Sequence, residues 1–171
     1  MSETNARYPK ALVVIHWVTA AAVLGAWATA EGGREVVRNP PLLHFTLGIA
    51  VLALVLPRLV LRLTGSAVES DHRSRALGVA AGAGHGLLYA LLIALPITGW
   101  YVVSQMGVQV QVLGLHLPAL TAPIQGRPGA NAEFHESAGS IILLLAGLHA
   151  LAAIWHQFVL RDGTLRRMSL S

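Results

Sequence analysis

The sequence predicts an all-α membrane protein, a bundle of four transmembrane helices with both termini in the cytoplasm. Three observations lead to this fold class. Of the 171 residues, 54% are apolar and only 12% are charged, which is too apolar a composition for an ordinary soluble domain. Four apolar runs are each long enough to cross a bilayer as a helix. The basic residues gather on one side of these runs.

The apolar runs predict helices over residues 11–30, 42–63, 77–103 and 134–160. Each reaches about 20 residues, the length that spans the hydrocarbon core. We expect a single domain over residues 1–171, with residues 104–132 as the longest loop. Residues 28–30 resemble a signal-peptide cleavage site, but the apolar run before them is longer than the ~7–15 residues typical of such signals.

The 12 basic residues are divided unequally between the two sides of the predicted bundle. One side would carry three of them, Arg34, Arg38 and Arg127. The termini and the loop between the second and third helices, with its flanks, would carry the rest: Arg7, Lys10, Arg58, Arg62, Arg73, Arg75, Arg161, Arg166 and Arg167. The positive-inside rule therefore places both termini in the cytoplasm.

The first helix is expected to begin close to Pro9, because proline is favoured in the first turn of a helix. His16 and Trp17 follow, about one turn inside the cytoplasmic surface. This pair has two interpretations. It is either an interfacial histidine beside a tryptophan of the aromatic belt, or part of a functional site.

The second helix is expected to begin after two prolines at 40–41, which places His44 in its first turn on the outer side. Arg58 lies about four turns further on the same face, and Arg62 lies one turn beyond it. The two arginines either extend to the cytoplasmic surface or bind the propionates of a buried cofactor.

The third helix carries His85 among several glycines on the cytoplasmic side, where small residues allow a neighbouring helix to approach closely. Pro96 is expected to kink this helix. In the loop that follows, residues 108–112 alternate between apolar and polar side chains, which allows either a short strand-like segment or an interfacial one. The later prolines of the loop argue against a helix there.

The fourth helix carries three histidines within an apolar run. His135 and His149 are separated by nearly four whole turns, so their rings leave the same face, ~21 Å apart along the axis. His156 follows about two turns later on nearly the same stripe. Because ionisable side chains are costly inside a membrane, this arrangement indicates a functional site.

Composition also excludes several classes of site. The chain has no cysteine, which excludes disulfides, thiolate metal sites, iron–sulfur clusters and covalently attached haem. The formal charge of +4 comes without a basic, aromatic-rich patch, so nucleic acid is not an expected partner.

Depth in the bilayer groups the histidines into two levels. The outer level would hold His44 and His135. The inner level would hold the others: His16, His85, His149 and His156. Two facing histidines do not make a good zinc site, because zinc needs three or four protein ligands. Axial ligation of haem iron needs two, and Gly48, Gly139 and Gly147 lie near these histidines, so the spacing favours two b-type haems.

Short motifs in all four predicted helices form one larger pattern. They are His16-Trp17, His44-x-x-x-Gly48, Arg58-x-x-x-Arg62, Gly84-His85 and Phe134-His135-Glu136 … Gly147-Leu148-His149 … His156. With these motifs the sequence resembles the bacterial cytochrome b561 family. In size and layout it is most similar to the small stand-alone di-haem members of the superoxide oxidase type.

The resemblance implies two haem b groups inside the bundle. It implies His44 and His135 as the iron ligands of the outer haem. It implies His16 and His149 as the iron ligands of the inner haem, with His85 as an alternative to His16.

The resemblance also implies a quinone near the inner haem. His85 and His156 are then candidates for hydrogen bonding to the quinone and for passing protons, because imidazole exchanges protons near neutral pH. Arg58 and Arg62 are candidates for binding the haem propionates.

The implied function is a di-haem b oxidoreductase of the bacterial inner (cytoplasmic) membrane. It would move electrons from periplasmic superoxide through the outer and inner haems to ubiquinone. The alternative is a cytochrome b electron-transfer subunit between a periplasmic redox partner or dehydrogenase and the quinone pool. A third interpretation is a haem-free four-helix protein that carries or senses a metal. The lipid bilayer, a quinone and superoxide or another periplasmic donor are the expected partners.

Overall fold

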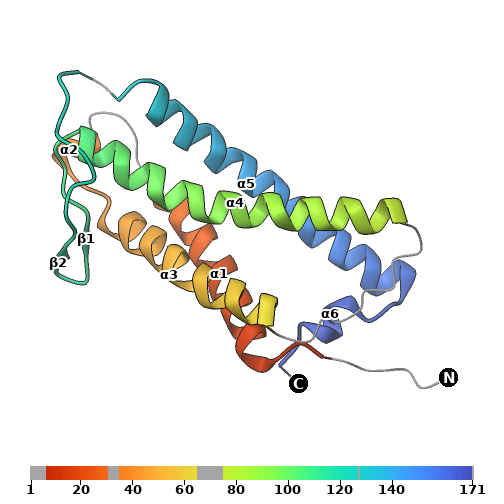
Figure 1. The fold of residues 1–171 in the computed structure, drawn as a ribbon. Coiled ribbons are helices and arrows are strands. Elements are labelled where there is room, and N and C mark those ends of the chain that lie inside the picture. The colour runs from red at the N-terminus through yellow and green to blue at the C-terminus, as the bar shows by residue number, and fades with distance from the viewer. Residues whose placement is uncertain (1–6, 31–34, 65–74, 127, 171) are drawn as a thin grey trace.

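The computed structural model shows a bundle of four long helices and describes residues 7–30, 35–64, 75–126 and 128–170 (Figure 1). The long helices are α1 (Lys10–Ala28), α3 (Leu42–Thr64), α4 (Arg75–Gln105) and α5 (Ala130–Trp155). The shorter elements are α2 (Glu35–Arg38), β1 (Gln111–Val112), β2 (Leu115–His116), the π-helix η1 (His156–Leu160) that continues α5, and α6 (Thr164–Arg167). The prediction of four long apolar helices is confirmed.

All four long helices are long and apolar enough to cross a membrane, and α1, α4 and α5 show almost no separate polar face, unlike surface helices in water. Large apolar side chains cover the outside of the bundle, including Leu24, Leu144 and Leu151, each more than half exposed. Lipid would cover these side chains in a membrane. The helices therefore form because their backbone groups have no other partners in hydrocarbon, and packing only has to orient them.

The helices pack in the order α1, α3, α4 and α5. Gly25 lets α1 approach α3, because a Cβ at this position would lie 2.9 Å from Leu47 Cδ1. Between α3, α4 and α5 the core includes Val55, Leu92 and Ile142. Within the described residues, α5 makes few or no close backbone contacts with α1 or α3. The backbone of α5 therefore lies further from the α1–α3 pair than from α4, and side chains such as Ala22 and Ala138 fill the core between them.

The segment between α4 and α5 contains a small antiparallel hairpin, in which Gln111 pairs with His116 and Val112 with Leu115. The turn residues Leu113 and Gly114 have φ values of 51° and 84°, as the tight turn of a two-residue hairpin requires. The predicted strand at 108–112 is therefore present only at its last two residues. A hydrogen bond from Trp100 Nε1 to the Pro118 carbonyl (3.0 Å) fastens the segment to α4.

The bundle has two ends that matter for the site. The loop end carries α2, the hairpin and the start of α5, whereas the terminus end carries the start of α1 and α6 (Figure 1). At the terminus end, Trp17 Nε1 donates a hydrogen bond to the Met168 carbonyl (3.0 Å). The C-terminal segment is thereby fixed against α1, on the turn that carries His16.

Candidate functional site

At the loop end, His44 of α3 faces His135 of α5. Their ring centres are 6.1 Å apart and their planes differ by 79°. Nδ1 of His44 lies 2.7 Å from the carbonyl oxygen of Ala26, which can only accept, so Nδ1 carries the hydrogen. Nε2 of His44 keeps its lone pair. A backbone carbonyl that fixes one ring nitrogen is the usual support of a metal-ligating histidine.

His135 is held by the C-terminal third of α4. Its ring packs against Gly99, where a Cβ would lie 2.8 Å from His135 Cε1. The hydroxyl of Thr98 donates to the Ala94 carbonyl (2.8 Å), so its oxygen can accept from His135 Nδ1 at 3.3 Å. With Nδ1 as the donor, Nε2 of His135 is also left with a lone pair for a metal.

Towards the terminus end, three histidines from three helices come together. His149 of α5 has its ring centre 6.3 Å from that of His16 on α1. His85 on α4 is the third histidine, and its ring centre lies 5.3 Å from that of His149. Of the four histidines predicted at the inner level, the remaining one, His156, lies apart and contacts Asp162 instead.

Arg58 projects from α3 into this group of histidines. Its Nη2 is 2.9 Å from His16 Nδ1, and its guanidinium carbon is 5.3 Å from the ring centre of Tyr89. Nε of Arg58 is buried without a hydrogen-bond partner. Arg62, by contrast, is exposed. Of the two predicted propionate ligands, Arg58 is the one that contacts a histidine and has a buried N–H donor left for an anionic group.

The distances between the facing rings suit axial ligation of iron. Metal–nitrogen bonds of about 2 Å, with each ring centre about 1 Å beyond its nitrogen, place two axial rings about 6 Å apart. The pair at the loop end, at 6.1 Å, and the His16–His149 pair, at 6.3 Å, both match this separation. The His85–His149 separation of 5.3 Å is shorter.

The space beside these rings suits a flat macrocycle. A Cβ added at Gly48, Gly139 or Gly147 would meet no heavy atom within 4 Å. In the part of the chain that the structure describes, no three histidine, cysteine or acidic side chains converge to hold a metal ion. Each level has one facing pair of rings at a separation of about 6 Å, with open space at the three glycines, which fits haem b.

A four-helix membrane bundle with facing histidine pairs is the architecture of a membrane cytochrome b. The chain belongs to the prokaryotic cytochrome b561 family, whose model matches residues 7–169. It is therefore an electron-transfer protein of a family that binds haem b, and the family assignment made from the motifs is confirmed.

Three relatives match over nearly their whole lengths. The probable superoxide oxidase CybB of Yersinia pestis is 30% identical over 167 residues, covering 95% of both chains. Cytochrome b562 of Cereibacter sphaeroides is 32% identical over 171 residues, covering 94% of both chains. Cytochrome b561 homolog 2 of Escherichia coli (strain K12) is 30% identical over 188 residues, covering 98% of this chain and 95% of the relative.

Sequence reasoning missed two polar residues that contact the predicted histidines, Thr98 and Asp162. Thr98 gave no signal, because threonine is common in apolar helices. Asp162 did carry one, since Asp-Gly marks a turn and Asp is favoured just before a helix. That signal predicts the start of α6, but it does not pair Asp162 with His156.

Replacing Gly99 with alanine is expected to weaken haem binding at the loop end by about 10- to 100-fold. The new Cβ would lie 2.8 Å from the ring of His135 and push it from its position. Alanine favours helix, so α4 itself would stay intact. Gly82→Ala on the same helix meets nothing within 4 Å and should keep full haem content. The haem-to-protein ratio of the two purified variants measures the difference; equal ratios would contradict the prediction.

Proposed function

We propose that this protein is a di-haem b oxidoreductase that takes electrons from superoxide in the periplasm and delivers them to ubiquinone. The observation that carries the proposal is the presence of two facing histidine pairs at different levels of one bundle, with ring separations of 6.1 Å and 6.3 Å. A relative named as a probable superoxide oxidase supports the choice of substrate. In balance, two superoxide anions become two O₂, while one quinone takes two electrons and two protons to become quinol.

The residues of the two pairs would hold the cofactors. Bound haem supplies the one-electron chemistry that side chains cannot provide. His44 and His135 would ligate the outer haem, and His16 and His149 the inner haem. Arg58, with its unpaired buried Nε, is the stronger candidate for a propionate. Arg62 would contribute from the exposed end of α3.

The loop end offers a route for a small anion. An open pocket of about 480 Å³ lies there, lined by residues 28–30 and 41–44. His44 is one of the lining residues, and its Nδ1 is already bound to the Ala26 carbonyl. A small substrate entering this pocket would reach the outer pair without crossing the apolar core.

The terminus end offers a route for a lipid-soluble quinone. His156 lies where the apolar span of α5 and η1 ends, with its side chain 38% exposed. The neighbouring Trp155 and Phe158 are exposed and would face lipid. A quinone could therefore approach from the membrane and meet His156, with His85 beside the inner pair as the second candidate contact.

The basic residues support the orientation of this path. Most of the described basic residues, among them Lys10, Arg75 and Arg166, lie at the terminus end, so the positive-inside rule favours that end in the cytoplasm and the loop end in the periplasm. The protein would then be a multi-pass protein of the inner membrane. Protons for the quinone would come from the cytoplasm.

Superoxide is expected to reduce the oxidised, purified protein directly. Superoxide from xanthine oxidase would be added and the visible haem band followed, with superoxide dismutase as the control that abolishes the change. Ubiquinone added afterwards should reoxidise the haem. No reduction above the dismutase-treated background would rule out this substrate. A periplasmic redox protein that co-purifies and reduces the haem would then favour the electron-transfer subunit.

A further inference from the structure

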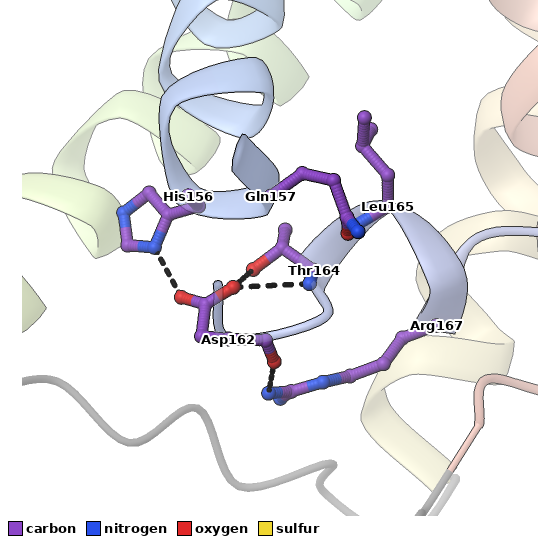
Figure 2. A network of polar contacts seen from close by, with 6 residues as sticks. All are labelled: His156, Gln157, Asp162, Thr164, Leu165 and Arg167. Atoms are coloured by element: carbon purple, nitrogen blue, oxygen red, sulfur yellow. Dashed lines mark hydrogen bonds and ion pairs between the residues drawn. The ribbon is translucent and has the colours of Figure 1, made fainter. Parts of the chain in front are cut away.

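The chain after α5 turns back and forms a network of polar contacts around Asp162 (Figure 2). Oδ2 of Asp162 lies 2.5 Å from His156 Nδ1. Oδ1 accepts two hydrogen bonds from Thr164, from its backbone N–H (3.0 Å) and its hydroxyl (2.5 Å). The Asp162 carbonyl accepts from the Arg167 guanidinium at 2.8 Å. Both carboxylate oxygens therefore have hydrogen-bond partners, Oδ1 in Thr164 and Oδ2 in His156.

The backbone is shaped to bring Asp162 to this position. The last turn of the span is the π-helix η1, and π-turns are frequent at functional sites. Arg161 then adopts a left-handed conformation (φ 56°), which costs free energy for a residue with a Cβ. Gly163 follows with φ 75°. These two left-handed positions on either side of Asp162 reverse the chain, and the contacts of its carboxylate offset the strain.

The negative charge of Asp162 determines which ring nitrogen of His156 donates to the carboxylate and which one is left to exchange a proton. Burial raises the pKa of Asp162, but hydrogen bonds from Thr164 and His156 outweigh burial and hold that pKa below its ordinary value. The carboxylate is thus ionised at neutral pH and can only accept, so Nδ1 of His156 must carry a hydrogen. The other ring nitrogen, Nε2, faces away from the network (Figure 2).

We infer that Asp162 is a positioning residue for proton transfer to the quinone: its carboxylate holds Nδ1–H of His156, so that Nε2 exchanges the proton. This inference rests on the proposed function. The Nε2–H bond of the imidazolium breaks as a quinone oxygen takes the proton, and Nδ1–H stays on Asp162. Nε2 then takes a proton from cytoplasmic water. Two such transfers, with two electrons from two superoxide anions, complete the quinol.

Replacement of Asp162 with asparagine tests this inference. The amide oxygen can still accept from Thr164, but the amide NH₂ faces Nδ1 of His156 and disfavours the imidazolium. With protein reduced beforehand by dithionite, the maximal rate of reoxidation by a short-chain ubiquinone is expected to fall about 10- to 100-fold, at unchanged KM. Reduction by superoxide and the visible spectrum should stay as in the wild type.

A second readout does not depend on turnover. In protein labelled with ¹⁵N-histidine, the hydrogen-bonded Nδ1–H of His156 should give a resonance that disappears in both Asp162→Asn and His156→Gln. The double variant should reoxidise no more slowly than His156→Gln alone, because Asp162 acts only through that ring. Additive losses, or a wild-type rate in Asp162→Asn, would overturn the inference.

Arg167→Gln is the matched structural control. It removes the bond to the Asp162 carbonyl but leaves the carboxylate on His156, so the quinone rate should be that of the wild type. If it slows reoxidation as much as Asp162→Asn, or if Asp162→Asn raises KM alone, the contact is only structural. Thr164→Val loosens the carboxylate without removing it. Thr164→Val should also lower the maximal rate of reoxidation at unchanged KM, but by a smaller factor than Asp162→Asn. If Asp162→Asn does not fold, the result for Thr164→Val tests the inference in its place.

Reduction of the protein by dithionite makes a failure of this inference distinguishable from a failure of the proposed function. Dithionite replaces the physiological donor, so a failure of superoxide to reduce the wild type leaves the comparison of variants unaffected. A wild-type protein that quinone cannot reoxidise would instead contradict the proposed function itself.

Discussion

Replacing both His135 and His149 with alanine is expected to give a stable four-helix membrane protein that binds no haem. Each histidine belongs to a different facing pair, so the double variant leaves one axial ligand at each level. Each single variant should lose about half of the pigment, because a haem with one axial ligand left is weakly held. The haem-to-protein ratio, measured on protein purified after growth with added haem, reports the loss.

The loss should be specific, because the helices do not depend on these imidazoles. Alanine has the highest helix propensity, and removing an ionisable side chain lowers the cost of placing α5 in the membrane. His116 is the matched control, since it is exposed on β2 and its alanine variant should keep all pigment. A His135/His149 double variant that still holds its full complement of haem would mean that the facing rings are not the ligands.

The levels of the histidines could be predicted from the sequence because they depend only on the geometry of a helix. The rise per residue fixes how far His135 and His149 are separated along α5, whatever packs around them. Likewise, the length of each apolar run decides that a span forms. The structure accordingly places His44 opposite His135 and His149 among the inner histidines.

The partner of each ring could not be predicted in the same way, because it depends on the rotation of each helix about its axis. Helices α1, α4 and α5 have almost no separate polar face, so their sequences carry no pattern that fixes this rotation. Small residues fix it instead: Gly25 sets the contact of α1 with Leu47, and Gly99 receives the ring of His135. The inward direction of Arg58 was open for the same reason, since its sequence position allowed it to extend to the surface as well.

The segments outside the spans were the least predictable. The hairpin turn at 113–114 depends on two residues with positive φ, of which only Gly114 gives a sequence signal. The contact between Asp162 and His156 depends on a π-helix and a left-handed Arg161, neither of which has a reliable sequence pattern. These features follow from tertiary contacts, and they therefore became visible only in the structure.

Replacing His16 with alanine is expected to remove the inner haem, whereas His85→Ala should keep it. The two candidates differ in how their helices meet α5. Helix α4, which carries His85, packs directly against α5, and direct packing leaves only about 8–10 Å between helix axes. Helix α1, which carries His16, has few or no close backbone contacts with α5 in the described residues. The α1 side is therefore the one on which the backbones already stand further apart, and the ring separation of His16 and His149 (6.3 Å) suits axial ligation.

The contact of Arg58 with His16 adds a condition to this prediction. A guanidinium only donates, so Nδ1 of His16 accepts from Arg58 and Nε2 carries the hydrogen. Ligation through Nε2 requires the hydrogen to be on Nδ1, so Arg58 must turn to another acceptor when haem binds. A propionate would be that acceptor and would also serve the unpaired Nε.

Haem content and quinone kinetics distinguish the two histidines. His16→Ala should retain about half of the pigment, while His85→Ala should retain all of it and slow reoxidation by ubiquinone about 10- to 100-fold if His85 contacts the quinone. The reverse pattern, with pigment lost only in His85→Ala, would make His85 the axial ligand. The 5.3 Å separation of His85 and His149 would then have to widen when haem binds, by a movement of α4 away from α5.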